Sequence, residues 1–228
     1  MTPPVRMTLG YGTASLGRSL SRRERVHLLE TAYDCGIRWF DTAPLYGAGA
    51  AEEALGRFLR GKDDVVVATK VGIVPPGLLG VALRRPATGG RFAPADVRRQ
   101  VERSLRRLRR DSVDVVLLHE VDASAAPAAL DALDLLRIAG TLRLTGIATG
   151  TSQTEAILAS RVPDVVQVAA GSVVGTRGAR LIVHSVIAGR TEPAGELLRA
   201  AAFAYPESVV LVGSRNADHI REAATALG

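Results

Sequence analysis

Residues 36–59, GIRWFDTAPLYGAGAAEEALGRFL, contain a pattern that indicates the fold class of the whole chain. The first glycine of this stretch is followed by an apolar run of strand length, residues 37–41, and then by a turn of small residues and proline. An amphipathic run, residues 50–60, comes next and is typical of a helix. The same strand-then-helix order recurs along the chain, which predicts parallel strands joined by right-handed crossovers.

Along the whole chain, eight runs of strand length and seven of helix length are expected. The strands are residues 8–14, 37–41, 65–70, 113–119, 144–148, 164–169, 180–185 and 208–212. The helices are residues 22–35, 50–60, 94–108, 125–139, 152–160, 192–203 and 216–226. Ser21 followed by Glu24 predicts a capping box, and Pro94 suits a first helical turn. This pattern predicts an α/β fold, a (β/α)8 TIM barrel formed by residues 1–228 as one domain.

One crossover departs from the repeat. The segment AAGSVVGTRGAR between the sixth and seventh strands is too short and too rich in glycine for a helix with its turns. We therefore expect the helix between strands 6 and 7 to be missing or reduced. An apolar strip of these two strands would then be exposed, which favours a homodimer. The alternative is that Val173, Val174 and their neighbours fold back as a local cover.

The long connection after the third strand, VGIVPPGLLGVALRRPATGGRF, is expected to be a functional loop at the carboxyl ends of the strands. Its Arg84, Arg85 and Arg91 are candidates for binding an acidic substrate, although a solvated run of charges is the simpler explanation. The sequence ends at Gly228, directly after the last helix, so we expect an open, shallow site on that side.

Composition excludes several classes of function. The net charge of +6 invites a nucleic-acid partner, but the arginines alternate with apolar positions in helices and aromatic residues are few, so none is expected. No apolar run could span a membrane, and MTPPVRMTLGYG lacks the order of a secretory signal, so a cytoplasmic protein is expected. Cys35 is the single cysteine and is interpreted as a core residue without chemistry. We expect no metal site.

Ionisable residues end three of the predicted strands. Alternate residues of a strand share a face, so Asp41, Lys70 and His119 each continue the apolar face of their own strand to its carboxyl end. Active sites of β/α barrels lie at this end. Tyr46 follows just beyond the second strand. The four residues are therefore candidates for one catalytic site.

The same residues carry a resemblance to the aldo-keto reductases. Residues 36–59 resemble that family's signature of a strand-borne Asp, a Tyr five residues later, a Gly, and a helix opening with Glu. VVVATKVG, VERSLRRLRRDSVDVVLLHEVD and LLRIAGTLRLTGIATG follow at similar spacing. The resemblance is strong over residues 9–150, weak over 151–190 and moderate over 208–226.

The resemblance implies NADP(H)-dependent reduction of a small aldehyde or ketone, or the reverse oxidation, with Tyr46 as the proton donor. A phenol is a poor acid at neutral pH, and the Lys70 ammonium would lower the pKa of Tyr46 by stabilising the phenolate. Asp41 would pair with Lys70 and hold it in place. His119 would hydrogen-bond the substrate carbonyl and orient it.

Cofactor contacts are also implied by the resemblance. Gln167 stands where the family has a glutamine that holds the nicotinamide carboxamide. Ala148 and Thr149 replace a Ser-Asn pair of the same clamp, so one hydroxyl and one amide are missing. His184 and Ser185 stand where the family has Tyr-Ser, so an imidazole would stack on the nicotinamide.

The last cofactor block is VVLVGSRNADHIREAA. Ser214, Arg215 and Asn216 lie at the start of the last predicted helix, where amide donors and the helix dipole favour a phosphate. Arg215 argues for NADP(H) over NAD(H). His219, in the same helix, is interpreted as facing solvent.

Three functions remain open from the sequence. The first is an active carbonyl reductase, indicated by the complete set of four catalytic candidates. The second is an enzyme on the same scaffold that uses Tyr46 and Lys70 for acid–base chemistry such as dehydration or cyclisation, with weak or no cofactor use. Ala148 and His184 favour it. The third, a nonenzymatic binding subunit, gives no reason for the whole catalytic set.

Overall fold

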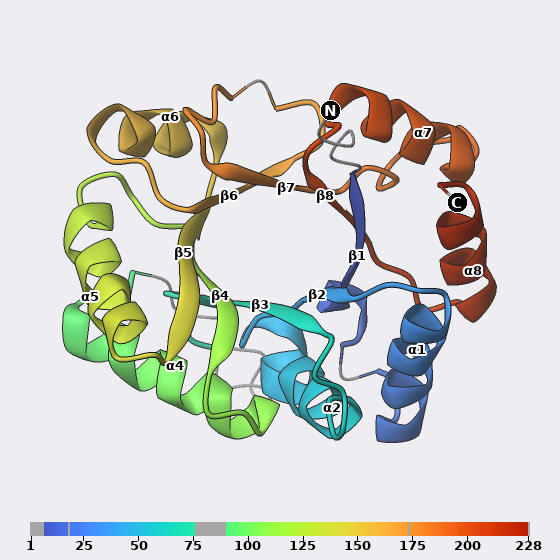
Figure 1. The fold of residues 1–228 in the computed structure, drawn as a ribbon, viewed down its shortest axis with the longest axis horizontal. Coiled ribbons are helices and arrows are strands. Elements are labelled where there is room, and N and C mark those ends of the chain that lie inside the picture. The colour runs from blue at the N-terminus through green and yellow to red at the C-terminus, as the bar shows by residue number, and fades with distance from the viewer. Residues whose placement is uncertain (1–6, 18, 76–89, 173, 228) are drawn as a thin grey trace, which may run out of the picture.

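The protein is a closed barrel of eight parallel strands in chain order, with β8 hydrogen-bonded to β1. The structure is a computed structural model that describes residues 7–17, 19–75, 90–172 and 174–227. In Figure 1 the strands form a ring and the helices lie around its outside. The strands are β1 (Thr8–Gly12), β2 (Trp39–Asp41), β3 (Val66–Val71), β4 (Val113–His119), β5 (Leu142–Ala148), β6 (Val165–Ala169), β7 (Arg180–His184) and β8 (Val209–Val212). The predicted (β/α)8 architecture is confirmed.

Seven α-helices are found among the described residues, as predicted. They are α1 (Arg22–Asp34), α2 (Ala50–Phe58), α4 (Pro94–Leu108), α5 (Ala126–Ile138), α6 (Thr151–Ser160), α7 (Ala194–Ala204) and α8 (Ala217–Thr225). The predicted capping box starts α1: the Glu24 amide donates to the Ser21 hydroxyl, and the Ser21 amide donates to the Glu24 carboxylate. None of the described helices is long and apolar enough to cross a membrane.

Two short 3-10 helices lie at the carboxyl-end face. They are η1 (Thr13–Ser15), after β1, and η2 (Tyr46–Gly49), before α2. The expectation of a first strand over residues 8–14 was therefore too long, because the chain turns after Gly12. Cys35 caps the end of α1 and is partly exposed, so its interpretation as a core residue was wrong.

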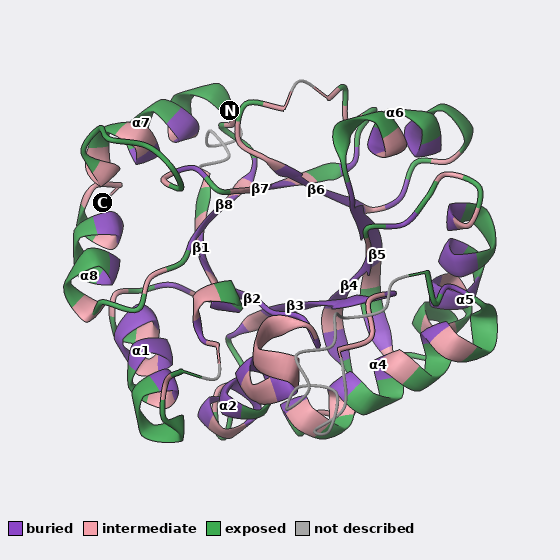
Figure 2. Ribbon diagram, turned by 180° about the vertical axis from the view of Figure 1, so that it is seen from behind, coloured by how far each residue is buried: buried purple, intermediate pink, exposed green. Residues whose placement is uncertain are grey.

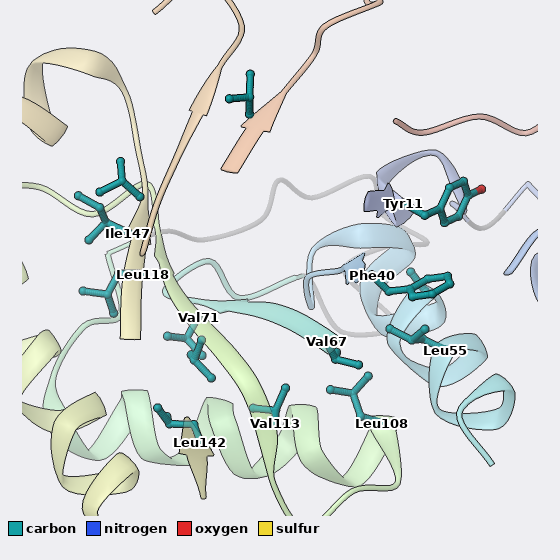
Figure 3. Packing of buried hydrophobic residues seen from close by; sticks show 14 of the residues in the cluster. Tyr11, Phe40, Leu55, Val67, Val71, Leu108, Val113, Leu118, Leu142 and Ile147 are labelled. Atoms are coloured by element: carbon teal, nitrogen blue, oxygen red, sulfur yellow. The ribbon is translucent and has the colours of Figure 1, made fainter. Parts of the chain in front are cut away.

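The strand alternation produces two apolar clusters. The smaller one fills the barrel and includes Ala68, Val115 and Leu117, with Trp39 packed against it. The larger one lies between the strands and the surrounding helices, and Figure 2 shows the helices buried on their barrel-facing sides. Figure 3 shows part of this outer cluster around β3, β4 and α4, with Val67 and Leu108 labelled.

The crossover from β6 to β7 contains no helix in its described residues, 170–172 and 174–179, as Figure 1 also shows. The predicted missing helix is therefore confirmed. The expected exposed strip is not found: the outward-facing side chains of Val166, Val168 and Val183 are 0%, 4% and 0% exposed. Val174 packs against the outer cluster, which favours the local cover, while Val173 lies outside the described residues. With these side chains buried, an exposed strip no longer favours a homodimer.

The long loop after β3 is described only at its ends. Residues 76–89, with the candidate substrate-binding Arg84 and Arg85, lie outside the described residues. Arg91 is exposed.

Candidate active site

Asp41, Lys70 and His119 end or nearly end three consecutive strands, and they meet Tyr46 at the carboxyl-end face of the barrel. The Lys70 ammonium donates to three oxygens: Asp41 Oδ1 at 2.5 Å, the Thr42 carbonyl at 3.1 Å and the Tyr46 hydroxyl at 3.2 Å. All four candidate catalytic residues line the same cavity. The structure thus brings together the set that the sequence predicted.

Lys70 and Asp41 form a buried ion pair, with side chains 2% and 3% exposed. Burial by itself lowers the pKa of Lys70, but the Asp41 carboxylate and the Tyr46 phenol raise it further than burial lowers it. Lys70 is therefore held as an ammonium. The second oxygen of Asp41 accepts from the Gln167 side-chain amide at 3.0 Å, so the carboxylate is fixed from two sides.

The balance at Tyr46 differs from the expectation. Burial raises the pKa of Tyr46, and the Lys70 ammonium opposes this effect without overcoming it, so the net direction is upward. The expected lowering of the Tyr46 pKa rested on the nearby cation alone, whereas burial also makes the phenolate costly by removing its solvation. Tyr46 is accordingly held in its protonated form, from which a proton can be given.

His119 is kept neutral by its surroundings. Burial, with smaller contributions from Lys70 and His184, lowers the pKa of His119 to about 4. Burial also lowers the pKa of His184, where Asp41 opposes and Lys70 adds to the effect. A neutral imidazole can donate a hydrogen bond from one ring nitrogen. His119 therefore suits hydrogen bonding to a neutral carbonyl.

This state of His119 predicts a pH dependence of stability. Its folded pKa lies below the unfolded value of about 6.5, so the unfolded chain binds more protons and stability falls as pH drops from 6.5 towards 4. His119 should account for about 1.5 kcal/mol of lost unfolding free energy between pH 6.5 and pH 5. Urea unfolding of the wild type and His119→Gln at both pH values measures it. Equal losses in the two proteins would contradict the assigned environment of His119.

The cavity has a volume of about 610 Å³ and extends from the four candidate catalytic residues to helix α8. Gln167, His184, Ser185 and Ser214 line it, as expected for cofactor contacts. His184 Nδ1 lies 2.8 Å from the Ser185 hydroxyl, and Ser185 has a positive φ of 60°. The side chain of His184 is therefore tethered at the end of β7.

Three other predicted cofactor residues do not line the cavity. The Thr149 hydroxyl donates to the Val121 carbonyl at 3.2 Å. The Arg215 guanidinium lies 3.3 Å from the Ser19 hydroxyl, and the Asn216 side chain accepts from an amide as the cap of α8. Their contacts with a cofactor remain predictions.

Several residues that line the cavity were not predicted from the sequence. Glu120, Glu192 and Glu222 line the cavity, and so does His219, although His219 is exposed as expected. Helical spacing could have indicated Glu222, because it lies three residues after His219 and so shares its face. No pattern in the sequence pointed to Glu192.

Comparison with known proteins agrees with this geometry. The model of the aldo/keto reductase family matches residues 8–173. A D-threo-aldose 1-dehydrogenase from a Pseudomonas species is 37% identical over 169 residues, which are 63% of this chain and 50% of that protein. The chain spans half or less of the length of the curated relatives it matches.

Solved structures extend the likeness over nearly the whole chain. A protein of Pseudomonas aeruginosa described as an aldo-keto reductase is 28% identical with a TM-score of 0.79, covering 98% of this chain and 91% of that one. An aldo-keto reductase of Klebsiella pneumoniae in complex with NADPH is 22% identical with a TM-score of 0.74, covering 96% and 85%. This chain belongs to the aldo-keto reductase family.

Proposed function

We propose that the protein reduces a small aldehyde or ketone to an alcohol with NADPH, or catalyses the reverse oxidation. One observation carries the proposal: the Lys70 ammonium contacts Asp41 and the Tyr46 hydroxyl together, on the wall of a cavity that His119 also lines. A phenol beside a buried cation is a proton donor whose conjugate base is stabilised.

Each residue has a distinct task in this reaction. Tyr46 gives its proton to the carbonyl oxygen, and the charge left on its oxygen is stabilised by Lys70. Asp41 keeps Lys70 charged and in place. Neutral His119 donates a hydrogen bond that orients the carbonyl. When bound, NADPH supplies the hydride.

The cavity fits a dinucleotide of this kind. Its volume of about 610 Å³ lies within the ~300–1,000 Å³ usual for cofactor sites. Gln167, His184 and Ser185 would hold the nicotinamide end, and Ser214 would face the phosphates near the start of α8. At Gly213 a Cβ would lie 2.8 Å from the Gly12 carbonyl oxygen, so only glycine allows β8 and β1 to approach so closely beside the cavity.

Acid–base chemistry without hydride transfer is the second candidate. Ala148 offers no polar side chain to a cofactor, and the Thr149 hydroxyl is already bonded to Val121. The Gln167 amide is likewise bonded to Asp41. These three observations leave fewer polar groups to bind a nicotinamide. They do not affect the contact between Tyr46 and Lys70, on which acid–base chemistry would depend.

Titration with NADPH, followed by nicotinamide fluorescence, separates the two candidates. The reductase proposal expects saturable binding, and Arg215→Ala should weaken NADPH much more than NADH because only NADPH carries the phosphate that a guanidinium can grip. Arg221→Ala, in helix α8 just after Arg215 in the chain, is the control and should leave both affinities unchanged. Absence of binding would favour the acid–base candidate, and equal losses for both cofactors would place Arg215 away from the phosphate.

A further inference from the structure

A buried carboxylate lies directly behind the catalytic turn. Glu52, in the first turn of α2, is 0% exposed. Its Oε1 accepts from the Thr69 hydroxyl at 2.8 Å, and its Oε2 pairs with Arg107 Nη1 of α4 at 2.9 Å. A charge buried this completely is costly unless paired. Glu52 is paired with groups from two other elements, so it ties α2 to β3 and to α4.

Arg107 also packs against the turn that carries Tyr46. A Cβ at Gly49 would lie 2.6 Å from the Arg107 guanidinium carbon, so the guanidinium packs against the backbone of the turn. At Gly56 a Cβ would lie 2.2 Å from the Arg107 carbonyl oxygen, so α2 and α4 are in backbone contact at the same residue. Arg107 is therefore held at both its main chain and its side chain.

The turn needs such support. Three consecutive residues of η2 have positive φ: Gly47 at 62°, Ala48 at 54° and Gly49 at 93°. Ala48 carries a Cβ, which makes this conformation unfavourable. A strained turn persists only when its surroundings hold it. Arg107 packs against this turn at Gly49, and Glu52 fixes the Arg107 guanidinium there.

The contacts of Glu52 and Arg107 connect the turn that carries Tyr46 with the strand that carries Lys70. The turn begins at Tyr46, and Thr69 is the neighbour of Lys70 in β3. We propose that Glu52 and Arg107 are positioning residues, which hold the Tyr46 turn against β3 and so set the contact between the Tyr46 hydroxyl and the Lys70 ammonium. This role rests on the proposed function of Tyr46. Neither Glu52 nor Arg107 lines the catalytic cavity.

The test compares Glu52→Gln with Glu53→Gln in the full chain. Glu53 is the exposed neighbour of Glu52 in α2, and no ion pair of its carboxylate is found among the described residues. In Glu52→Gln, kcat for 4-nitrobenzaldehyde should fall roughly 10- to 100-fold, since a misplacement of about 1 Å can cost 100-fold. The KM for NADPH should stay unchanged. Glu53→Gln should behave as wild type.

A second measurement does not depend on activity. The protein has four tyrosines, so the ¹³Cζ signal of labelled Tyr46 can be assigned with Tyr46→Phe. It should move in Glu52→Gln and stay in place in Glu53→Gln. If the wild type turns over no aldehyde, the proposed reductase activity fails, while this signal still decides the positioning role.

The inference is overturned if Glu52→Gln lowers only the melting temperature and leaves the Tyr46 signal and kcat unchanged, because the network would then be structural alone. An equal effect of Glu53→Gln also overturns it. Should Glu52→Gln fail to fold, Arg107→Lys keeps the charge but shortens the reach over Gly49. The ¹³Cζ signal of Tyr46 is expected to move in Arg107→Lys as well. Arg106→Lys, at an exposed position, is the control. A Tyr46 signal that does not move in Arg107→Lys contradicts the proposal.

Discussion

Replacement of Tyr46 by Phe is expected to remove nearly all carbonyl reduction, by roughly 100- to 10,000-fold in kcat, the usual contribution of a positioned acid. The ring that packs against the outer cluster remains, and only the hydroxyl that contacts Lys70 is lost. NADPH affinity and the melting temperature should therefore change little. Steady-state turnover of 4-nitrobenzaldehyde, with NADPH titration in parallel, measures both effects.

Tyr33→Phe is the matched control, because the Tyr33 hydroxyl donates to Asp64 on the surface and Tyr33 does not line the catalytic cavity. It should keep the wild-type rate. A wild-type rate in Tyr46→Phe would show that another group supplies the proton. His119 would then be the first candidate, although its pKa of about 4 leaves it largely unprotonated at neutral pH.

Local sequence patterns were enough to predict most of the strands and helices and the four candidate catalytic residues. Helix 94–108 and strand 113–119 have the predicted bounds, because Pro94 starts the helix and an unbroken apolar run forms the strand. Strand alternation placed Asp41, Lys70 and His119 at one rim, which requires only a period of two and parallel strands. Such features are determined by a few neighbouring residues.

Properties that depend on packing between distant segments were not predictable in this way. The cover over Val166 and Val183 depends on how residues 170–172 and 174–179 lie in space, not on the length of the segment. The pKa of Tyr46 depends on a balance of burial and charge that requires the folded cavity. Arg215 lies at the predicted place in the chain but is directed to Ser19, which is 196 residues away in sequence.

The buried ion pair leads to the other large effect. Asp41→Asn keeps the shape of the side chain but removes the charge opposite Lys70, and places an amide between two donors, Lys70 and Gln167. Breaking one partner of a buried pair typically costs about 3–5 kcal/mol, because the other charge stays buried without compensation. That loss of unfolding free energy is expected at pH 7, measured by urea unfolding.

The pH dependence identifies the cause of this loss. In the wild type the pKa of Lys70 is raised, so its contribution to stability is present below pH 10.5 and is lost as pH rises through the folded pKa. In Asp41→Asn burial acts without the carboxylate and should lower the pKa of Lys70 below its unfolded value. The unfolded chain then binds more protons, so the variant should gain stability between pH 7 and pH 9 relative to the wild type.

Asp64→Asn, which breaks the exposed pair with Arg38, should show no such gain. If the stability of Asp41→Asn relative to the wild type stays constant or falls between pH 7 and pH 9, Lys70 is not an uncompensated cation in the variant.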